Sequence, residues 1–253
     1  CLAEMNPPPH GIPLPVILVT GFLGAGKTTL LLRWLSEAPS TGLRMGVVMN
    51  EFGAESVDGQ LVRRPGLSIT QVDGGCLCCA PDDSLERACR AMARDGQCDY
   101  LVVETSGLAD PDNVIDVLTD PDLLDVVRLK SVVTVVDAPW FLRPEGGVGE
   151  RVLARRQVEY ADVVALSRCD LMDTPEVGEA EASIKEWNSR SSVVRMPFGL
   201  PDLPGILAGP CAHAAVEGAH APSLNAAPPA HLHARYRSVS WRFPVPIHRD
   251  AFA

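Results

Sequence analysis

The chain has 253 residues and carries 22 Lys and Arg against 32 Asp and Glu, a formal net charge of −10. This acidic balance argues against nucleic acid as a partner, because nucleic-acid binding relies on basic side chains that neutralise phosphates. The hydrophobic share of 46% suffices for the core of one or two domains, and no apolar run reaches the roughly 18 residues of a membrane-spanning helix.

We expect residues 1–13 to form an N-terminal tail. They contain no charged segment followed by an apolar stretch, so we expect no signal peptide and a cytoplasmic protein. Cys1 does not fit a normal initiator, and Met5 is a candidate for the natural first residue.

A phosphate-binding loop is predicted at residues 21–28. The preceding residues 15–20 are apolar and rich in β-branched side chains, which indicates a buried strand. The loop reads GFLGAGKT and matches G-x-x-x-x-G-K-[ST], and residues 27–38 have helical spacing. Because strand, glycine-rich turn and helix are the context that this motif requires, we prefer a phosphate loop to a chance turn.

Each part of this loop has an expected role in binding a nucleoside triphosphate. Glycines let backbone N–H groups turn inward around phosphate oxygens, and the following helix adds a positive N-terminus. Lys27 should reach the β- and γ-phosphates and assist catalysis, Thr28 should offer its hydroxyl to Mg²⁺, and Thr29 should bond the α-phosphate. The predicted phosphate-binding residues are Gly21, Gly24, Ala25, Gly26, Lys27, Thr28 and Thr29.

An alternation of strands and helices continues beyond the loop. Further strands are predicted at 45–49, 67–72, 100–103, 131–136 and 163–166. Helices are predicted from about 83 to 94, from 114 onward and at 176–188. This order predicts an α/β fold with a mostly parallel central sheet flanked by helices, the architecture of a P-loop nucleotide triphosphatase.

Three acidic residues are candidates for the Mg²⁺ site, because ligands of open parallel sheets bind at the carboxyl ends of strands. Glu104 follows a predicted strand and should hold the metal's water shell or orient the attacking water, and Gly107 should place an N–H on the γ-phosphate. Glu51 is expected to approach the metal or the water, and Asp58 is a further metal-shell candidate. The alternatives are a capped turn at 104–107 and solvated loop acids at the other two positions.

Three of the eight cysteines lie within four positions, at Cys76, Cys78 and Cys79. Thiolates are soft ligands suited to ions such as Zn²⁺ and Cu⁺, and the N-terminus of a following helix favours the thiolate form. We predict a transition-metal site whose fourth ligand is left open. Buried structural cysteines and redox sensing are the alternatives.

The periodic pattern ends near residue 208, so we expect the P-loop domain to span residues 14–208. Residues 209–234 are rich in Ala, Pro and His and predict a linker. Residues 235–253 alternate like a strand and then begin a helix. Because a lone strand cannot form a domain, we expect the start of a truncated C-terminal α+β domain there.

Six motifs occur in one order along the chain: GFLGAGKTTLL, NEFG, GGCLCC, ETSGLADP, VVDA and QVEYAD. Together they make residues 14–208 resemble the CobW family of P-loop GTPases, which are relatives of UreG and HypB. GGCLCC is the most diagnostic motif, since the phosphate loop alone is generic. By the same resemblance, residues 235–253 look like the opening of the family's C-terminal domain.

The resemblance implies a GTPase that delivers a metal ion, commonly zinc or cobalt, to a client metalloprotein. Carried over by position, it implies that Glu104 and Gly107 lie at the γ-phosphate. It also implies that Cys76, Cys78 and Cys79 hold the cargo metal. Similar GTPases pair across the nucleotide site, so a homodimer is an expected assembly.

Two positions depart from the family's pattern. The guanine-reading motif, usually Asn/Thr-Lys-x-Asp, reads here Ser167-Arg168-Cys169-Asp170. Asp170 can still accept from guanine N1 and N2, and Arg168 can stack its stem over the base, but Ser167 lacks the amide of Asn. We therefore expect a weakened preference for GTP over ATP. The family often has Glu at position 54, where this chain has Ala54, which leaves one metal ligand fewer unless Glu55 substitutes.

The leading hypothesis is a GTP-hydrolysing metallochaperone with GTP, Mg²⁺ and Zn²⁺ or Co²⁺ as its ligands. Nucleotide-ordered loops around Glu51 and Glu104 would bias the thiol segment, so that the metal binds in one state and leaves in the other. One rival is an ATP- or GTP-dependent kinase or ligase, which needs an acceptor pocket. The other is a zinc-binding regulator with a degenerate nucleotide site, against which the intact Lys27 and Thr28 weigh.

Overall fold

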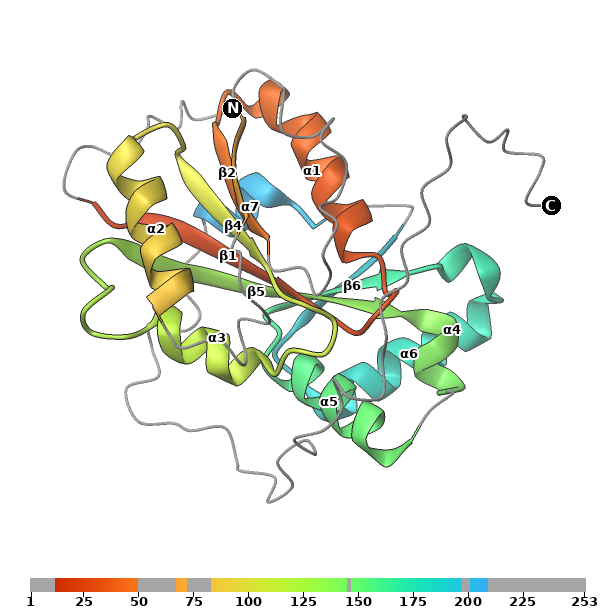
Figure 1. Cartoon of the computed structure of the whole chain (residues 1–253). Helices are drawn as coiled ribbons and strands as arrows, with labels where there is room; N and C mark the ends of the chain where they lie inside the picture. The colour runs from red at the N-terminus through yellow and green to blue at the C-terminus, as the bar shows by residue number, and fades with distance from the viewer. Residues whose placement is uncertain (1–11, 50–66, 72–82, 145–146, 197–200, 209–253) are drawn as a thin grey trace, which may run out of the picture.

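The computed structural model describes residues 12–49, 67–71, 83–144, 147–196 and 201–208. Within these residues the chain forms one sheet of seven strands in the order β3-β2-β4-β1-β5-β6-β7 (Figure 1). Every neighbouring pair in the sheet is parallel. The strands are β1 (Leu14–Thr20), β2 (Met45–Met49), β3 (Leu67–Gln71), β4 (Tyr100–Glu104), β5 (Val127–Asp137), β6 (Val163–Ser167) and β7 (Ser192–Arg195).

The predicted parallel sheet is confirmed, and two of its strands differ from the prediction. β5 begins at Val127 rather than at residue 131, because its first residues alternate buried and exposed side chains instead of forming an apolar run. β7 is not predicted at all. It has one neighbour in the sheet, and its four side chains are exposed or half-buried, so it lacks the apolar signal of a central strand.

Helices cover both faces of the sheet. They are α1 (Lys27–Thr41), α2 (Asp83–Asp95), α3 (Pro111–Leu118), α4 (Ala138–Leu142), α5 (Val148–Glu159), α6 (Thr174–Trp187) and α7 (Leu203–Ala208), with a 3₁₀ turn at Cys169–Leu171. Alternate side chains of β1 enter opposite cores. Ile17 and Val19 pack in the core that α1 and α7 cover, whereas Val16 and Leu18 pack in the core that α2 and α3 cover.

Local capping explains where two predicted helices begin. The Asp110 side chain accepts a hydrogen bond from the backbone N–H of Asp112, and Pro111 follows it, so α3 begins three residues before the predicted start at 114. At α6, Asp173 and Glu176 form a reciprocal capping box, so that helix begins at Thr174. Helices α4, α5 and α7 are not predicted from the sequence.

Several predicted segments lie outside the described residues. These are the cysteine segment, the loops around Glu51 and Asp58, the linker at 209–234 and the expected domain start at 235–253. Within the described part, the first element is β1, which begins at Leu14, and the last is α7, which ends at Ala208. The domain bounds of 14 and 208 stay a prediction. None of the helices in the described ranges has the length and apolar character needed to cross a bilayer.

The sheet order places the end of β1 at a crevice. β1 lies between β4 and β5, and the chain leaves β1 toward α1 on one face but leaves β4 toward α3 on the other. Loops that diverge in this way open a space beyond the carboxyl ends of the strands, where open α/β sheets bind their ligands. The phosphate loop lies at this point (Figure 1).

Candidate functional site

The phosphate loop begins with a glycine that no other residue can replace. Gly21 has a φ of +135°, and a Cβ built on it would lie 2.2 Å from the carbonyl oxygen of Val135 on β5. Side chains of L-residues rarely adopt this φ, and the contact is with backbone, which cannot yield. The turn out of β1 therefore depends on a glycine pressed against the neighbouring strand.

The N-terminus of α1 is open to an anion. Gly26 occupies the N-cap position, no side chain caps the helix, and its first turn contains no acidic residue. The first N–H groups of a helix have no partner within the helix, and the helix dipole adds positive potential there. An uncapped glycine-led helix start is therefore built to receive phosphate oxygens.

Lys27 is folded over the loop that precedes it. Its side chain is 8% exposed, and Nζ donates to the carbonyl oxygen of Gly21 at 2.9 Å and to that of Phe22 at 3.3 Å. Burial lowers the pKa of Lys27 from its ordinary value, and the charge of Glu104 partly offsets this. The loop thus holds a buried cation whose desolvation cost the negative charge of a bound triphosphate would offset.

Thr28 and Glu104 meet across the crevice. The Thr28 hydroxyl donates to Oε1 of Glu104 at 3.0 Å, and Glu104 is 5% exposed at the end of β4. The register of the sheet sets Glu104 beside Val19 of β1. A hydroxyl and a carboxylate at this distance are the hard oxygen donors that Mg²⁺ prefers, so the pair fits the predicted magnesium site.

Gly107 packs directly on the phosphate loop. A Cβ on Gly107 would lie 2.6 Å from the backbone nitrogen of Leu23. The segment that follows β4 is also tied to β1, because the N–H of Thr105 donates to the carbonyl oxygen of Val19 at 3.0 Å. The backbone at 105–107 is therefore held against the loop that would carry the phosphates.

The three predicted base-reading residues line one pocket with the phosphate loop. A pocket of about 280 Å³ is lined by Ala25, Gly26, Thr29, Leu30, Arg33, Ser167, Arg168, Asp170 and Met196. Ser167 is buried, and its hydroxyl lies 2.7 Å from the carbonyl oxygen of Ala25. Ser167 thereby ties the end of β6 to the phosphate loop although it lacks the amide of Asn. Sequence reasoning missed Arg33 and Met196, whose places in this pocket depend on the packing of α1 and β7.

Arg168 is held from two sides. It has a φ of 57°, and its guanidinium donates to the carbonyl oxygen of Gly24 at 3.0 Å and pairs with Asp137 at the end of β5. Asp137 also caps α4 by accepting from the N–H of Trp140 at 3.1 Å. Asp137 is a further residue that sequence reasoning missed. Its motif, VVDA, carried no signal that it would reach the base-reading segment.

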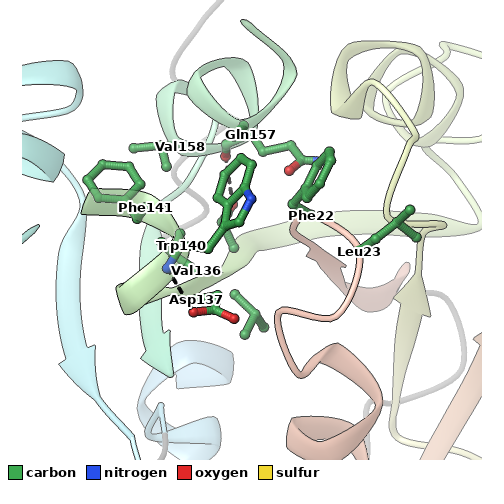
Figure 2. A pocket seen from close by; sticks show the side chains of 11 residues that line it. Phe22, Leu23, Val136, Asp137, Trp140, Phe141, Gln157 and Val158 are labelled. Carbon is green, nitrogen blue, oxygen red and sulfur yellow. Dashed lines mark hydrogen bonds between the residues drawn. The ribbon is translucent and has the colours of Figure 1, made fainter. Parts of the chain in front are cut away.

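An aromatic contact joins α4 to the phosphate loop. The rings of Phe22 and Trp140 are stacked with centroids 4.8 Å apart. Figure 2 shows Trp140 in the middle of a small pocket, with Phe22 on one side and Phe141 on the other. The space measures about 80 Å³, well below the roughly 300 Å³ of small-molecule sites, so this contact braces the loop and does not form a ligand pocket.

Glu51, Asp58 and the cysteines of GGCLCC lie outside the described residues. Within the described residues no group of three or more His, Cys, Asp and Glu side chains could hold a metal ion. The described thiols are buried and free, and burial raises the pKa of Cys89 to about 12 and that of Cys98 to about 11, so they stay protonated at neutral pH.

Comparison with known proteins gives consistent matches. The family model of the CobW/HypB/UreG nucleotide-binding domain matches residues 15–195. The zinc chaperone YjiA of Escherichia coli is 35% identical over 200 residues, which are 76% of this chain and 60% of YjiA. The zinc chaperone CobW of Pseudomonas aeruginosa is 31% identical over 224 residues, 77% of this chain and 59% of that protein.

A solved structure agrees with these sequence matches. The crystal structure of the Zn(II)-bound YjiA GTPase from E. coli superposes with a TM-score of 0.54 at 31% identity, covering 76% of this chain and 60% of that one. The chain thus spans about 60% of the length of these two relatives.

Proposed function

Because the chain belongs to the CobW/HypB/UreG family through its nucleotide-binding domain, we propose that it binds and hydrolyses GTP and uses this cycle to control a bound transition metal. The observation that carries the proposal is the crevice beyond β1. There an uncapped helix N-terminus, the ammonium group of Lys27 and the Thr28–Glu104 pair lie together beyond the ends of β1 and β4, a combination of groups that suits a triphosphate with Mg²⁺.

Hydrolysis in this proposal rests on positioning and charge. Lys27 holds the β- and γ-phosphate oxygens, and the N–H groups at the start of α1 hold the phosphate nearest the helix. Thr28 and Glu104 would hold Mg²⁺, which when bound neutralises charge that develops on the phosphates. Glu104 and Glu51 orient the attacking water, Gly107 presents its backbone N–H to the γ-phosphate, and Asp58 is the further carboxylate of the metal's water shell.

The pocket beside the phosphate loop supports guanine as the base. Asp170 is exposed at its rim, where its carboxylate would accept from guanine N1 and N2. Arg168 lies beside it with the guanidinium anchored to Gly24 and Asp137, so its aliphatic stem is available to the base. Asp170 cannot accept from the corresponding edge of adenine, which offers no donor at N1.

The cargo metal in this proposal is zinc or cobalt, held by Cys76, Cys78 and Cys79. Two relatives carry the name zinc chaperone, and the structure of one contains Zn(II). The thiol segment precedes α2, and soft thiolates select such ions. Delivery to a client metalloprotein, pairing of two copies and the role of residues 209–253 as linker and second-domain start belong to the same proposal.

A zinc titration of the purified chain in three nucleotide states tests this function. We expect zinc affinity to differ at least about tenfold among the nucleotide-free, GTP-analogue and GDP states, the range typical of allosteric coupling. Replacement of Cys76, Cys78 or Cys79 by Ser should weaken zinc binding in every state. Cys89→Ala is the matched control, because it removes a thiol that burial keeps protonated.

GTP turnover without any co-substrate separates the proposal from its rivals. A kinase or ligase would need an acceptor, and a regulator with a degenerate site would bind zinc without hydrolysis. Equal zinc affinity in all three states would exclude the coupling even if GTP were hydrolysed.

A further inference from the structure

One buried amide on α5 contacts the segment that would sense the γ-phosphate. Gln157 is 1% exposed, and its Nε2 donates to the carbonyl oxygen of Ala109 at 3.2 Å and to that of Gly107 at 3.4 Å. Two carbonyl oxygens face the same side-chain atom, which requires the amide nitrogen there. The Thr134 hydroxyl also holds the backbone of this residue, because it donates to the backbone carbonyl oxygen of Gln157 at 2.7 Å.

Apolar packing joins the same three segments. Leu108 and Leu153 are buried together, and Phe22 of the phosphate loop packs against them. Leu153 and Gln157 are four residues apart on α5, so they share one face of the helix. Figure 2 shows the Gln157 side chain beside Phe22. These contacts connect the phosphate loop, the segment after β4, and α5.

The backbone at Gly107 is therefore gripped from two sides. Leu23 of the phosphate loop leaves no room for a Cβ on one side, and Gln157 holds the carbonyl oxygen on the other. The far end of the segment is anchored to α5 as well. Arg156 Nε lies 3.1 Å from Asp110 Oδ2, and Tyr160 donates to Asp112 at 2.5 Å.

We propose that Gln157 is the positioning residue that aims the backbone N–H of Gly107 at the γ-phosphate. The inference rests on the proposed GTPase function. The Gly107 carbonyl shares a rigid peptide plane with the N–H of Leu108, and only the φ and ψ of Gly107 separate that plane from the one that carries the Gly107 N–H. The bond that fixes the carbonyl therefore also restricts where the Gly107 N–H points. GTP differs from GDP only by the group at this position, so Gln157 would act on the discrimination between the two nucleotides.

A pair of amide-to-acid substitutions tests this role. In Gln157→Glu the donor is replaced by a carboxylate that faces two carbonyl oxygens. We expect the ratio of GTP-analogue to GDP affinity to fall about tenfold, the cost of one misplaced hydrogen bond, with GDP affinity within about twofold of wild type. The rate constant kcat for GTP should fall in parallel, because Gly107 would contact the γ-phosphate in the transition state.

Asn188→Asp is the matched control. Asn188, the C-cap residue of α6, is 6% exposed, and its Nδ2 donates to the carbonyl oxygens of Val158 at 2.9 Å and Ala161 at 2.7 Å. These carbonyls belong to the C-terminal end of α5 and the residues after it, not to the segment that follows β4. The change removes the amide donors that hold the end of α5 and should lower the melting temperature without changing the ratio of GTP-analogue to GDP affinity. Should Gln157→Glu fail to fold, Gln157→Met removes the donor without a buried charge and should give the same shift.

The outcomes separate this role from the proposed function. A wild-type ratio in Gln157→Met, or an equal loss of GTP-analogue and GDP affinity, would overturn the role of Gln157 and leave the GTPase intact. Failure of the wild-type chain to bind GTP would overturn both.

Discussion

The ammonium group of Lys27 is buried against the phosphate loop, and this has a measurable consequence for stability. Burial lowers its pKa below the ordinary 10.5, so between the folded-state pKa and 10.5 the unfolded chain binds more protons at this position than the folded chain. The free energy of unfolding therefore rises with pH through the window that ends at 10.5. The stabilisation is lost as the pH falls through the folded-state pKa.

We predict that Lys27→Met is more stable than wild type at neutral pH and that this advantage shrinks as the pH approaches 10.5. The reason is that the variant carries no buried charge to desolvate, whereas wild-type Lys27 loses its charge only as the pH rises through its lowered pKa. Urea unfolding of both proteins at a series of pH values measures the difference. Other groups that titrate in this range are present in both proteins, so their contributions cancel in the difference between the two free energies of unfolding. A difference that does not change with pH would show that the folded-state pKa is not lowered.

At the level of elements, the segment after β4 and the phosphate loop are in direct contact, and a single methyl group probes that contact. In Gly107→Ala the new Cβ would lie 2.6 Å from Leu23 N and 2.7 Å from Leu23 Cα. Both atoms are backbone, so one segment must move. We predict a loss of about 1–3 kcal/mol in the free energy of unfolding, typical of overpacking. We also predict that the substitution weakens the binding of GTP more than the binding of GDP.

Gly178→Ala on α6 is the control for this substitution, and we expect it to have the opposite sign. No atom lies within 4 Å of the point that a Cβ would occupy there, and the residue is inside a helix. Alanine at this position should raise the free energy of unfolding by roughly 0.5–1 kcal/mol. Denaturant unfolding of both variants measures the two changes in the free energy of unfolding. Equal effects of the two substitutions would contradict the close packing of Gly107 on Leu23.

The elements predicted from sequence are those with strong local signals. Central strands such as β1, β2 and β6 are buried along their whole length or nearly so, and their apolar runs reveal them. α5 was missed because its sequence, VGERVLARRQVE, has three arginines and few apolar residues, although Leu153 and Val158 are buried. Much of its buried surface is polar, with Gln157 and Glu150, which periodicity of apolar residues cannot detect.

The residues of the candidate site also fall into those that a local signal predicts and those that it does not. Residues in a continuous motif, such as Lys27 and Thr28, could be assigned expected roles because the motif itself implies the geometry. Asp137 and Gln157 could not, because each acts on a segment far away in the chain. Asp137 reaches Arg168 only because β5 and β6 pair in register at Asp137 and Ser167.

At the scale of the whole molecule, the site is formed along one edge of the sheet, where the parallel strands end. The ends of β1, β4, β5 and β6 supply the phosphate loop, Glu104, Asp137 and Ser167 in turn. Because the four strands are adjacent and parallel, the residues after them meet although they are up to about 150 positions apart in sequence. The two helix layers fix this edge by burying alternate side chains of every central strand.

A final prediction concerns how much of the chain this architecture needs. The described cores close within residues 12–208. On the α1 face, α7 contributes the buried Leu203 and Leu207, and the indole N–H of Trp34 donates to the carbonyl oxygen of Pro201 at 3.3 Å. We predict that a chain of residues 12–208 unfolds cooperatively in urea and binds GTP within about threefold of the full chain, since a threefold change is below 1 kcal/mol.

The matched control is a chain that ends at residue 196, before α7. Loss of Leu203 and Leu207 would expose the α1 face of the core, where Trp34 is 1% exposed. At about 1.5–3 kcal/mol for each buried leucine, the shorter chain should lose at least roughly 3 kcal/mol of unfolding free energy. That is a large share of the roughly 5–15 kcal/mol typical of a domain. Equal stability of the two chains would mean that α7 is not part of the core. Failure of the longer chain to fold would mean that the domain extends beyond residue 208.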